Sequence, residues 1–324
     1  MTGRIVGIGS YLPERIVTND DLAKIVETSD EWIQERTGIK SRHVSDPLVE
    51  KPSMMAGEAA KRALADAGID GSEIDLIVVS CTTPDLLFPS MACCVQKAVG
   101  AEGCGCFDVN SACPGWLAAF NTAQSFIESG NCKKALVVGA ECLTNFVDWT
   151  DRGSCILFGD GAGAVVLSAD DTMPKNKFIM HATSVKADCL YCESRMQPKR
   201  WEEEGFLDNT YFRMAGRDVF RFAVTEVPKV INELSEKYEF SLDEVDYFIL
   251  HQANARIIET IAKRLGQDLE KFPMTLFETG NTSTASIPTL LDTMKKDGRL
   301  KKGQKIVMSS FGAGLTWAAN YFEI

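Results

Sequence analysis

The sequence predicts an α/β protein built around a largely central sheet. Short apolar runs rich in Val and Ile, typical of buried strands, alternate with longer segments that have the pattern of helices. The expected strands are Ile5–Ile8, Leu76–Cys81, Ala135–Gly139, Ala164–Leu167, Tyr247–Leu250 and Lys305–Ser309. The expected helices are Met55–Ala67, Phe120–Ser129, Val219–Lys237 and Ala255–Leu265. Alternation of this kind is characteristic of α/β architecture.

A weak internal repeat predicts that the chain consists of two related halves. The segment "SEIDLIVVS" (Ser72–Ser80) resembles "DEVDYFILH" (Asp243–His251), which lies 171 positions later, from 72 to 243. At the same offset, "KKALVV" (Lys133–Val138) corresponds to "QKIVMS" (Gln304–Ser309). Two matches at one offset indicate a duplication. We expect the halves to be residues 1–170, which carry a candidate nucleophile, and residues 171–324, which carry candidate His and Asn helpers.

Length and charge limit the classes of function. The chain has 324 residues, enough for one large domain or two of ordinary size. Its 34 basic and 45 acidic residues give a net charge of −11, which argues against a nucleic-acid partner. It contains no apolar run of about 18 residues and no signal-type leader, so we expect no membrane partner and a cytoplasmic location.

The chain has eleven cysteines, an odd number, and is far too long to need disulfides for its stability. Most of them are expected to be buried, reduced and inert. Two close pairs, Cys104 with Cys106 and Cys189 with Cys192, have spacings that could suggest zinc. Because histidine is scarce and the pairs lack the usual ligand pattern, we expect no metal.

One cysteine stands in a distinctive context, in "FDVNSACPGWLAAF". Residues Cys106–Val109 are expected to form a strand and Trp116–Glu128 a helix, so that Cys113 would cap the helix. Pro114 would take the first helical position, where its missing N–H costs nothing, and Gly115 would let another segment approach closely. The helix dipole and free N–H groups would favour a thiolate. Cys113 is therefore a candidate nucleophile, and the alternative is an inert packed cysteine.

Three further positions could assist a nucleophile. His251 follows an expected strand, at the end where α/β proteins place their sites, although a structural histidine is the alternative. Asn281, in "ETGNTSTASIP", either makes a turn or offers its amide N–H to a developing negative charge. In "SSFGAGLTW", Gly312 and Gly314 bracket Ala313, so backbone N–H groups could face an oxyanion unless the segment is only a tight turn.

A short helix is expected in "TSDEWIQERTGI". Thr28 and Glu31 have the spacing of a capping box, and Gly38 can end the helix with a left-handed residue. Trp32 and Arg36 would then share one face, which suits an aromatic, phosphorylated ligand. This stretch alone favours the simpler alternative, a surface helix with a half-buried tryptophan.

Together these motifs resemble a known family. The chain is similar to the third type of β-ketoacyl-acyl-carrier-protein synthase, the initiating condensing enzyme of bacterial fatty acid synthesis. The resemblance covers nearly the whole chain through "GSYLPERIVTNDDL", "TSDEWIQERTGI", "DVNSACPG", "TDRGSCILFGDGAGA", "HQANARII", "GNTSTASIP" and "FGAGLTW", in that order. It implies a thiolase-like fold of two duplicated halves in a five-layered α/β/α/β/α arrangement, usually as a homodimer. It also implies acyl-CoA and malonyl-acyl-carrier-protein as substrates, with no metal or redox cofactor.

The resemblance assigns roles to particular residues. Cys113 would be the acylated nucleophile, and the backbone N–H groups of Cys113 and Ala313 would hold the oxyanion. His251 and Asn281 would bind the malonyl thioester oxygen and stabilise the enolate that forms when CO2 leaves. Substrate-binding residues for CoA and pantetheine would be Thr28, Trp32, Arg36, Arg152, Gly216, Asn254 and Phe311. Phe88 would reach the acyl pocket of a partner subunit. A local basic patch for the acidic carrier protein would consist of Arg221, Arg256, Lys263 and Arg264.

Related activities remain as alternatives. A biosynthetic thiolase would carry a second cysteine in "FGAGL", and the elongating synthases use a histidine where this chain has Asn281. The main alternative is therefore a Cys-His-Asn condensing or acyl-transfer enzyme of specialised, polyketide-like metabolism. A cysteine hydrolase and a non-catalytic binding module are weaker rivals. Pro114 and the stretch Val185–Phe206 depart from the family pattern, which leaves the starter acyl group open.

Overall fold

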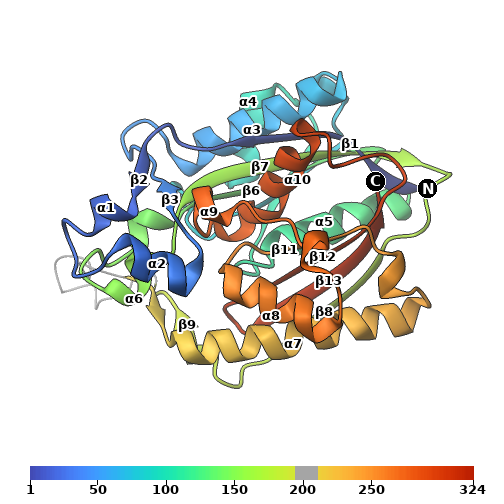
Figure 1. Ribbon diagram of the computed structural model, residues 1–324. Helices are drawn as coiled ribbons and strands as arrows, with labels where there is room; N and C mark the ends of the chain where they lie inside the picture. The colour runs from blue at the N-terminus through green and yellow to red at the C-terminus, as the bar shows by residue number, and fades with distance from the viewer. Residues whose placement is uncertain (194–210) are drawn as a thin grey trace.

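The computed structural model describes residues 1–193 and 211–324, and two sheets organise them (Figure 1). The first sheet has five strands in the order β1 (Thr2–Tyr11), β7 (Asp160–Asp170), β6 (Lys134–Cys142), β4 (Leu76–Ser80) and β5 (Gly105–Val109). The second has four strands in the order β11 (Tyr247–Leu250), β12 (Lys305–Gly312), β13 (Thr316–Glu323) and β8 (Lys177–Ala182). The expected strands all lie within these elements or at most one residue beyond them.

Helices form the other three layers (Figure 1). Helices α5 (Gly115–Glu128) and α10 (Ser286–Lys296) lie between the two sheets. The outer face of the first sheet is covered by α3 (Pro52–Ala67) and α4 (Met91–Val99), and that of the second by α7 (Gly216–Tyr238) and α8 (Ala255–Leu265). The predicted five-layered α/β/α/β/α arrangement is therefore confirmed.

The alternation of side chains along the strands explains the layers. In β6, Ala135 and Val137 pack toward the central helices, whereas Leu136 and Val138 pack toward α3 and α4. Successive residues of a strand point to opposite faces, so a strand that is apolar throughout requires cover on both sides. The same strands that look like short apolar runs in the sequence therefore become the buried sheets.

The two sheets share one plan. The pairs β4–β6 and β11–β12 are parallel, and in each sheet the next two pairings are antiparallel, β6–β7–β1 in the first and β12–β13–β8 in the second. Even the register agrees with the sequence repeat, because Val79 pairs with Val138 and Leu250 pairs with Ser309. The end of β7 at Asp170 and the start of β8 at Lys177 flank the expected division at residue 170, which stays a prediction.

Shorter elements complete the described chain. They are β2 (Ile16–Thr18), β3 (Ser41–His43), β9 (Leu190–Tyr191), β10 (Arg213–Met214), α1 (Asn19–Leu22), α2 (Asp30–Thr37), α6 (Arg152–Cys155) and α9 (Leu276–Thr279), with several single 3-10 turns. Of the unusual stretch Val185–Phe206, residues 194–206 lie outside the described ranges. No helix within residues 1–193 or 211–324 is long and apolar enough to cross a bilayer.

Candidate active site

The candidate nucleophile lies in a sharp turn between β5 and α5. Ala112 has φ 49°, a left-handed value that is uncommon for a residue with a side chain. The N–H of Gly115 donates to the Ala112 carbonyl oxygen at 2.8 Å, which closes this turn before the helix begins. The expectation that Cys113 caps the helix is therefore wrong by one residue, since Pro114 is the N-cap and Gly115 is the first helical residue.

A close approach at Gly115 was expected, and the structure shows what approaches. A Cβ atom at this position would lie 2.0 Å from Oγ of Ser80, at the end of β4. Glycine therefore allows the start of α5 to pack directly on the strand end. This contact fixes the position of the turn that carries Cys113.

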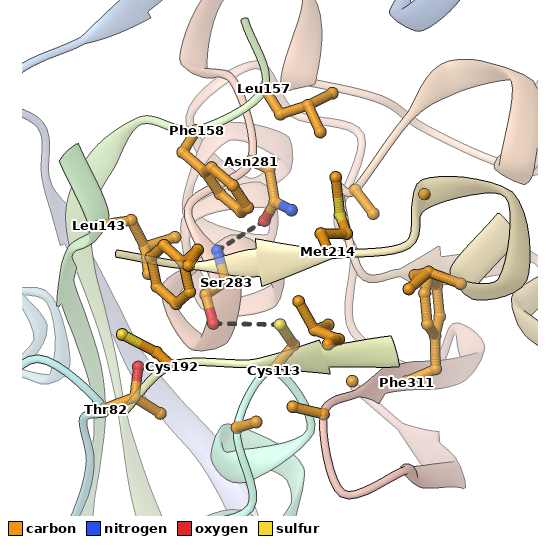
Figure 2. Close-up of a pocket in the computed structure, with 18 of the residues that line it drawn as sticks. Thr82, Cys113, Leu143, Leu157, Phe158, Cys192, Met214, Asn281, Ser283 and Phe311 are labelled. Atoms are coloured by element: carbon orange, nitrogen blue, oxygen red, sulfur yellow. Dashed lines mark hydrogen bonds between the residues drawn. The ribbon is translucent and has the colours of Figure 1, made fainter. Parts of the chain in front are cut away.

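The surroundings of Cys113 disfavour its thiolate form. Burial raises the pKa of Cys113 to about 11, although a hydrogen bond from Ser283 opposes that rise, and the nearby Glu141 adds to it. The expected stabilisation of a thiolate by the helix N-terminus is thus outweighed by loss of solvation. Ser283 Oγ donates to Cys113 Sγ at 3.2 Å (Figure 2).

His251 is held as a neutral hydrogen-bond donor. It directly follows β11, and its Nδ1 lies 2.8 Å from Oγ of Ser286. The N–H of Gln252 donates to the same oxygen at 3.4 Å, and the tautomer of the ring decides whether Ser286 donates to Nδ1 or accepts from it. In the tautomer in which the Ser286 hydroxyl donates to Nδ1, the imidazole proton resides on Nε2 and faces away from Ser286. Burial lowers the pKa of His251 to about 3, so the ring is uncharged at neutral pH.

Asn281 is oriented by its neighbours so that its amide group can donate. Its backbone N–H donates to Leu157 at 2.9 Å and its carbonyl accepts from Gly159 at 3.1 Å, which ties it to the segment before β7. Its Oδ1 accepts the backbone N–H of Ser283 at 2.8 Å (Figure 2). Ser283 adopts φ 48°, a strained left-handed conformation that turns this N–H back toward Asn281. Within residues 1–193 and 211–324, the Nδ2 group of Asn281 makes no hydrogen bond, whereas its Oδ1 is occupied by Ser283.

The glycine-rich segment after β12 lies against the nucleophile. A Cβ atom on Gly312 would lie 2.9 Å from the backbone nitrogen of Cys113 and 2.8 Å from Cδ of Pro114. Only glycine permits this approach. It brings the neighbouring Ala313 beside the Cys113 loop, as the oxyanion hypothesis requires.

A cavity of about 1340 Å³ joins these groups. Of the residues predicted from the sequence, it is lined by Trp32, Arg36, Cys113, Gly216, His251, Asn254, Arg256, Asn281, Phe311 and Ala313. Phe311 packs edge-on against the ring of His251, with centroids 5.6 Å apart. Leu143, Phe158, Met214 and Cys192 form an apolar wall around Cys113 and Asn281 (Figure 2). The cavity therefore combines a few polar groups with a mostly apolar lining, as small-molecule sites do.

One end of this cavity carries aromatic and basic groups. The guanidinium carbons of Arg36 and Arg152 lie 5.5 and 4.7 Å from the ring centroid of Trp32. The expected capping box is wrong by one residue, because Ser29 rather than Thr28 accepts the N–H of Trp32. Within the described chain, Oγ1 of Thr28 is buried without a hydrogen-bond partner. Thr28 and Arg152 stand outside the cavity lining, although Arg152 touches Trp32.

The remaining predicted positions lie on the surface. Phe88 is 79% exposed in a loop with the exposed Leu86 and Leu87, and it does not line the cavity of its own chain. The four basic residues are exposed on two helices that pack against each other, Arg221 on α7 and Arg256, Lys263 and Arg264 on α8.

All eleven cysteines lie in the described part of the chain, and none of them is in a disulfide there. Within residues 1–193 and 211–324, no group of three or more His, Cys, Asp or Glu side chains is arranged to hold a metal ion. Cys106 instead lies 3.3 Å from Cys93, sulfur to sulfur, whereas Gln96 donates to the carbonyl oxygen of Cys104.

Three residues near the site were missed by the sequence analysis. Ser283 contacts Cys113 and orients Asn281, Ser286 fixes the ring of His251, and Glu141 is a fully buried carboxyl group behind Ser283. A signal existed for Glu141, because a single acidic residue interrupts the apolar strand "KALVVGAEC". The two serines are hidden among several hydroxyl residues in "GNTSTASIP".

The five-layered fold and the Cys-His-Asn constellation define a condensing acyltransferase of the thiolase type. Comparisons give the particular family. Models of 3-oxoacyl-[acyl-carrier-protein] synthase III match residues 107–188, and models of its C-terminal part match residues 235–324. The β-ketoacyl-[acyl-carrier-protein] synthase III of Clostridium acetobutylicum is 46% identical over 315 residues, covering 97% of this chain and 96% of that protein.

Solved structures agree with this assignment. The 3-oxoacyl-[acyl-carrier-protein] synthase III of Aquifex aeolicus has a TM-score of 0.92 and 42% identity, covering 99% of this chain and 100% of that one. The priming β-ketosynthase of the R1128 polyketide pathway has a TM-score of 0.92 and 34% identity, covering 100% and 96%. The chain belongs to the 3-oxoacyl-[acyl-carrier-protein] synthase III family, condensing acyltransferases that initiate fatty acid synthesis.

Proposed function

We propose that this chain transfers an acyl group from acyl-CoA to Cys113 and condenses it with malonyl-acyl-carrier-protein, giving a 3-oxoacyl-acyl-carrier-protein. The observation that carries the proposal is the convergence on one cavity of a cysteine sulfur and two neutral donors, His251 and Asn281. Cys113 follows a strand of the first sheet, His251 follows a strand of the second, and Asn281 lies between α9 and α10, so the fold brings the three residues together.

In the first half of the reaction, the sulfur of Cys113 attacks the thioester carbonyl carbon of acyl-CoA. The developing oxyanion is held by the backbone N–H groups of Cys113 and Ala313, which the contact at Gly312 brings together. The tetrahedral intermediate collapses, the carbon–sulfur bond to CoA breaks, and Cys113 keeps the acyl group.

In the second half, the malonyl thioester enters the same cavity. Nε2–H of His251 and Nδ2–H of Asn281 donate to its thioester oxygen, and the resulting enolate is stabilised as CO2 leaves. The enolate carbon attacks the acyl carbonyl, and the sulfur of Cys113 departs. Because loss of CO2 drives the condensation, the proposed chemistry needs no metal or redox cofactor.

Binding of the two carriers is proposed from the charged and aromatic surfaces. Trp32, flanked by Arg36 and Arg152, would hold the CoA nucleotide, with Thr28 nearby. Gly216, Asn254 and Phe311 would line the pantetheine path to Cys113. The exposed cations of α7 and α8 would dock the acidic carrier protein. In a proposed homodimer, the exposed Phe88 would enter the acyl pocket of the partner subunit.

Intact-mass measurement after incubation with a panel of acyl-CoAs tests the proposal. We expect the wild-type protein to gain the mass of one acyl group, and Cys113→Ala to gain none, because the thioester cannot form without the sulfur. The acyl group that loads fastest identifies the starter.

Cys192→Ala is the matched control, because Cys192 lines the same cavity. This variant should load as the wild type does. An adduct that persists in Cys113→Ala, or the absence of an adduct from every acyl-CoA, would contradict the proposal.

A further inference from the structure

Two cysteines contact each other on the outer face of the first sheet, outside the cavity that holds Cys113. Cys93 lies in the first turn of α4, and Cys106 lies on β5. Their sulfur atoms are 3.3 Å apart, close enough for one thiol to donate a hydrogen bond to the other. Both side chains are half-buried, and neither is among the described residues that line the cavity. The pair therefore has no role in the acyl-transfer chemistry.

The contact between α4 and β5 holds the two cysteines in place. Side chains alternate between the two faces of a sheet along β5, so Cys106 and Asp108 point to the side that α4 covers. The carboxylate of Asp108 accepts the backbone N–H groups of Met91 and Ala92, both at 2.8 Å. These two hydrogen bonds fasten the start of the helix to the strand. The short distance between Cys93 and Cys106 is therefore a consequence of how helix and strand pack.

The surroundings of Cys93 favour its thiolate form. Its sulfur accepts a hydrogen bond from the Ser90 hydroxyl at 3.2 Å, and the Cys106 thiol can donate to it as well. Ser90 is the N-cap of α4, and Cys93 is the third residue of a helix whose N-terminal N–H groups favour negative charge. The hydrogen bonds from Ser90 and Cys106 lower the pKa of Cys93, although burial and the nearby Asp108 oppose that shift. The thiolate is the form of cysteine that reacts with oxidants.

The thiol of Cys106 has the opposite character. Burial raises the pKa of Cys106, and the neighbouring Cys93 raises it further. Cys106 therefore keeps its proton under conditions in which Cys93 ionises. Redox-sensing sites commonly combine a reactive thiolate with a second cysteine that resolves the oxidised sulfur. The two residues are unlike in the way that such a site requires.

We propose that Cys93 and Cys106 form a redox modification site, which a hydroperoxide oxidises to a reversible disulfide while Cys113 stays reduced. The basis of the proposal is the 3.3 Å contact between a hydrogen-bonded sulfur at the start of α4 and a second thiol on β5. It goes beyond the proposed function and does not depend on it, because neither cysteine takes part in acyl transfer.

Atoms and electrons balance over two steps. The Cys93 thiolate attacks one oxygen of the hydroperoxide, the oxygen–oxygen bond breaks, and the departing alkoxide takes up the proton that Cys93 had lost. Cys93 is then a sulfenic acid. The sulfur of Cys106 attacks the sulfur of Cys93, the sulfur–oxygen bond breaks, and hydroxide leaves as water with the proton of Cys106. Each sulfur loses one electron in total, and the hydroperoxide is reduced to an alcohol and water.

Cys113 lacks both features of this pair. Within residues 1–193 and 211–324, no second thiol hydrogen-bonds with its sulfur, which contacts the Ser283 hydroxyl instead. Burial raises the pKa of Cys113 to about 11, whereas hydrogen bonds lower that of Cys93. At neutral pH Cys113 therefore has the smaller thiolate fraction and no neighbour to resolve an oxidised sulfur. A hydroperoxide should react with the pair first.

Thiol counting after limited oxidation tests the proposal. The reduced protein is treated with an equimolar amount of hydrogen peroxide, unfolded and alkylated with N-ethylmaleimide, and its intact mass is measured. We expect two fewer alkyl groups than the eleven that the reduced chain takes up, and dithiothreitol should restore both. Peptide mapping should find one disulfide, between Cys93 and Cys106, and should find Cys113 alkylated.

Two variants separate the roles of the two thiols. In Cys106→Ala, oxidation should stop at the sulfenic acid of Cys93, which dimedone traps as an adduct that is visible by mass. In Cys93→Ala, Cys106 should stay reduced and gain no adduct, because the reactive thiolate is gone. Cys104→Ala is the matched control, since Cys104 packs on the same face of the sheet and its sulfur accepts from Gln96 at 3.6 Å. This variant should form the disulfide as the wild type does.

Each outcome bears on the redox site alone, because no acyl-CoA is used. Retention of all eleven free thiols, a disulfide between any other two cysteines, or oxidation of Cys113 before Cys93 would overturn the proposal. A dimedone adduct on Cys106 in Cys93→Ala that forms as fast as the adduct on Cys93 in Cys106→Ala would overturn the assigned roles. A wild-type protein that no acyl-CoA can load would overturn the proposed function and leave the redox site in place.

Discussion

The two sheets share one strand plan and differ in what their strand ends carry. Positions 171 apart correspond in the repeat, so His251 is the counterpart of Ser80 and Gly312 is the counterpart of Glu141. In the first sheet these positions hold a hydroxyl and a buried carboxyl group, and in the second they hold an imidazole and the glycine that touches Cys113. The two sheets thus have the same arrangement of strands, whereas the residues at their strand ends differ in the chemical groups that they place near the site.

Burial acts in opposite directions on the two titratable groups at these ends. It raises the pKa of Glu141 to about 7 and lowers that of His251 to about 3, because a low-dielectric interior disfavours the charged form of each. The histidine is therefore firmly neutral at pH 7, whereas the carboxyl group is poised to gain or lose a proton. Burial therefore disfavours charge at both strand ends, that of a carboxylate in the first sheet and that of an imidazolium in the second.

Of the substitutions considered, His251→Ala should lower the rate of condensation most. We expect the rate of condensation with malonyl-acyl-carrier-protein to fall by about 10²- to 10³-fold, the usual cost of one lost oxyanion donor. Acylation of Cys113, followed by intact mass, should stay within threefold, because its oxyanion donors are backbone groups. Product formation and acyl loading are measured separately on the same samples.

Ser80→Ala, at the corresponding position of the first sheet, is the control. Ser80 accepts a hydrogen bond from Thr284 at 3.1 Å and does not line the cavity, so its loss should lower stability more than activity. Equal losses of acylation and condensation in His251→Ala would show instead that the histidine takes the thiol proton.

Gly312→Ala should have the next largest effect. The added Cβ would lie 2.9 Å from the nitrogen of Cys113, so the nucleophile loop must shift. A displacement of about 1 Å at the reacting atom can cost on the order of 100-fold, and we expect the acylation rate to fall accordingly. Gly105→Ala is the control, because a Cβ there meets nothing closer than 3.6 Å. A normal acylation rate in Gly312→Ala would show that the Cys113 loop can accommodate the added Cβ atom without displacing the nucleophile.

The fold could be predicted largely because buried strands and helices leave periodic patterns. The strand Tyr247–Leu250 and the helix Ala255–Leu265 have the bounds expected from sequence. Strand β13 was not expected, since "TWAANYFE" places Asn320 at a fully buried position, where a hydrogen bond with Asn121 satisfies it. That partner lies on α5, far away in the sequence, so local pattern gives no sign of it.

The candidate site could be predicted only in part, because some of its features depend on contacts between segments that are far apart in the sequence. Cys113, His251 and Asn281 lie beside glycines or strand ends, which are local signals. The role of Ser283 depends on a left-handed backbone conformation, and the raised pKa of Cys113 depends on groups that pack around it from other segments. Neither can be deduced before the two sheets are brought together.

Ser286→Ala should have the smallest effect on condensation, because it keeps His251 and removes only the hydroxyl that hydrogen-bonds with its ring. Without the Ser286 hydroxyl, Nδ1 of His251 has no donor, and the neutral ring can place its proton on either nitrogen. Loss of one such hydrogen bond corresponds to about 1 kcal/mol, so we expect condensation to fall roughly fivefold while acylation is unchanged. Nitrogen-15 NMR of the labelled histidine should report a shift from the Nε2–H tautomer to a mixture.

Thr289→Ala lies on the same helix and offers a matched control. Its Oγ1 is buried and has no hydrogen-bond partner in the described chain, so its removal should change neither the tautomer nor the rate. If Ser286→Ala kept the Nε2–H tautomer and the full condensation rate, the second sheet would hold its donor by packing against Phe311 alone. Hydrogen bonding would then orient only Cys113 and Asn281, and Ser283 would supply it in both cases. Helix α10 would make no contribution to the orientation of His251.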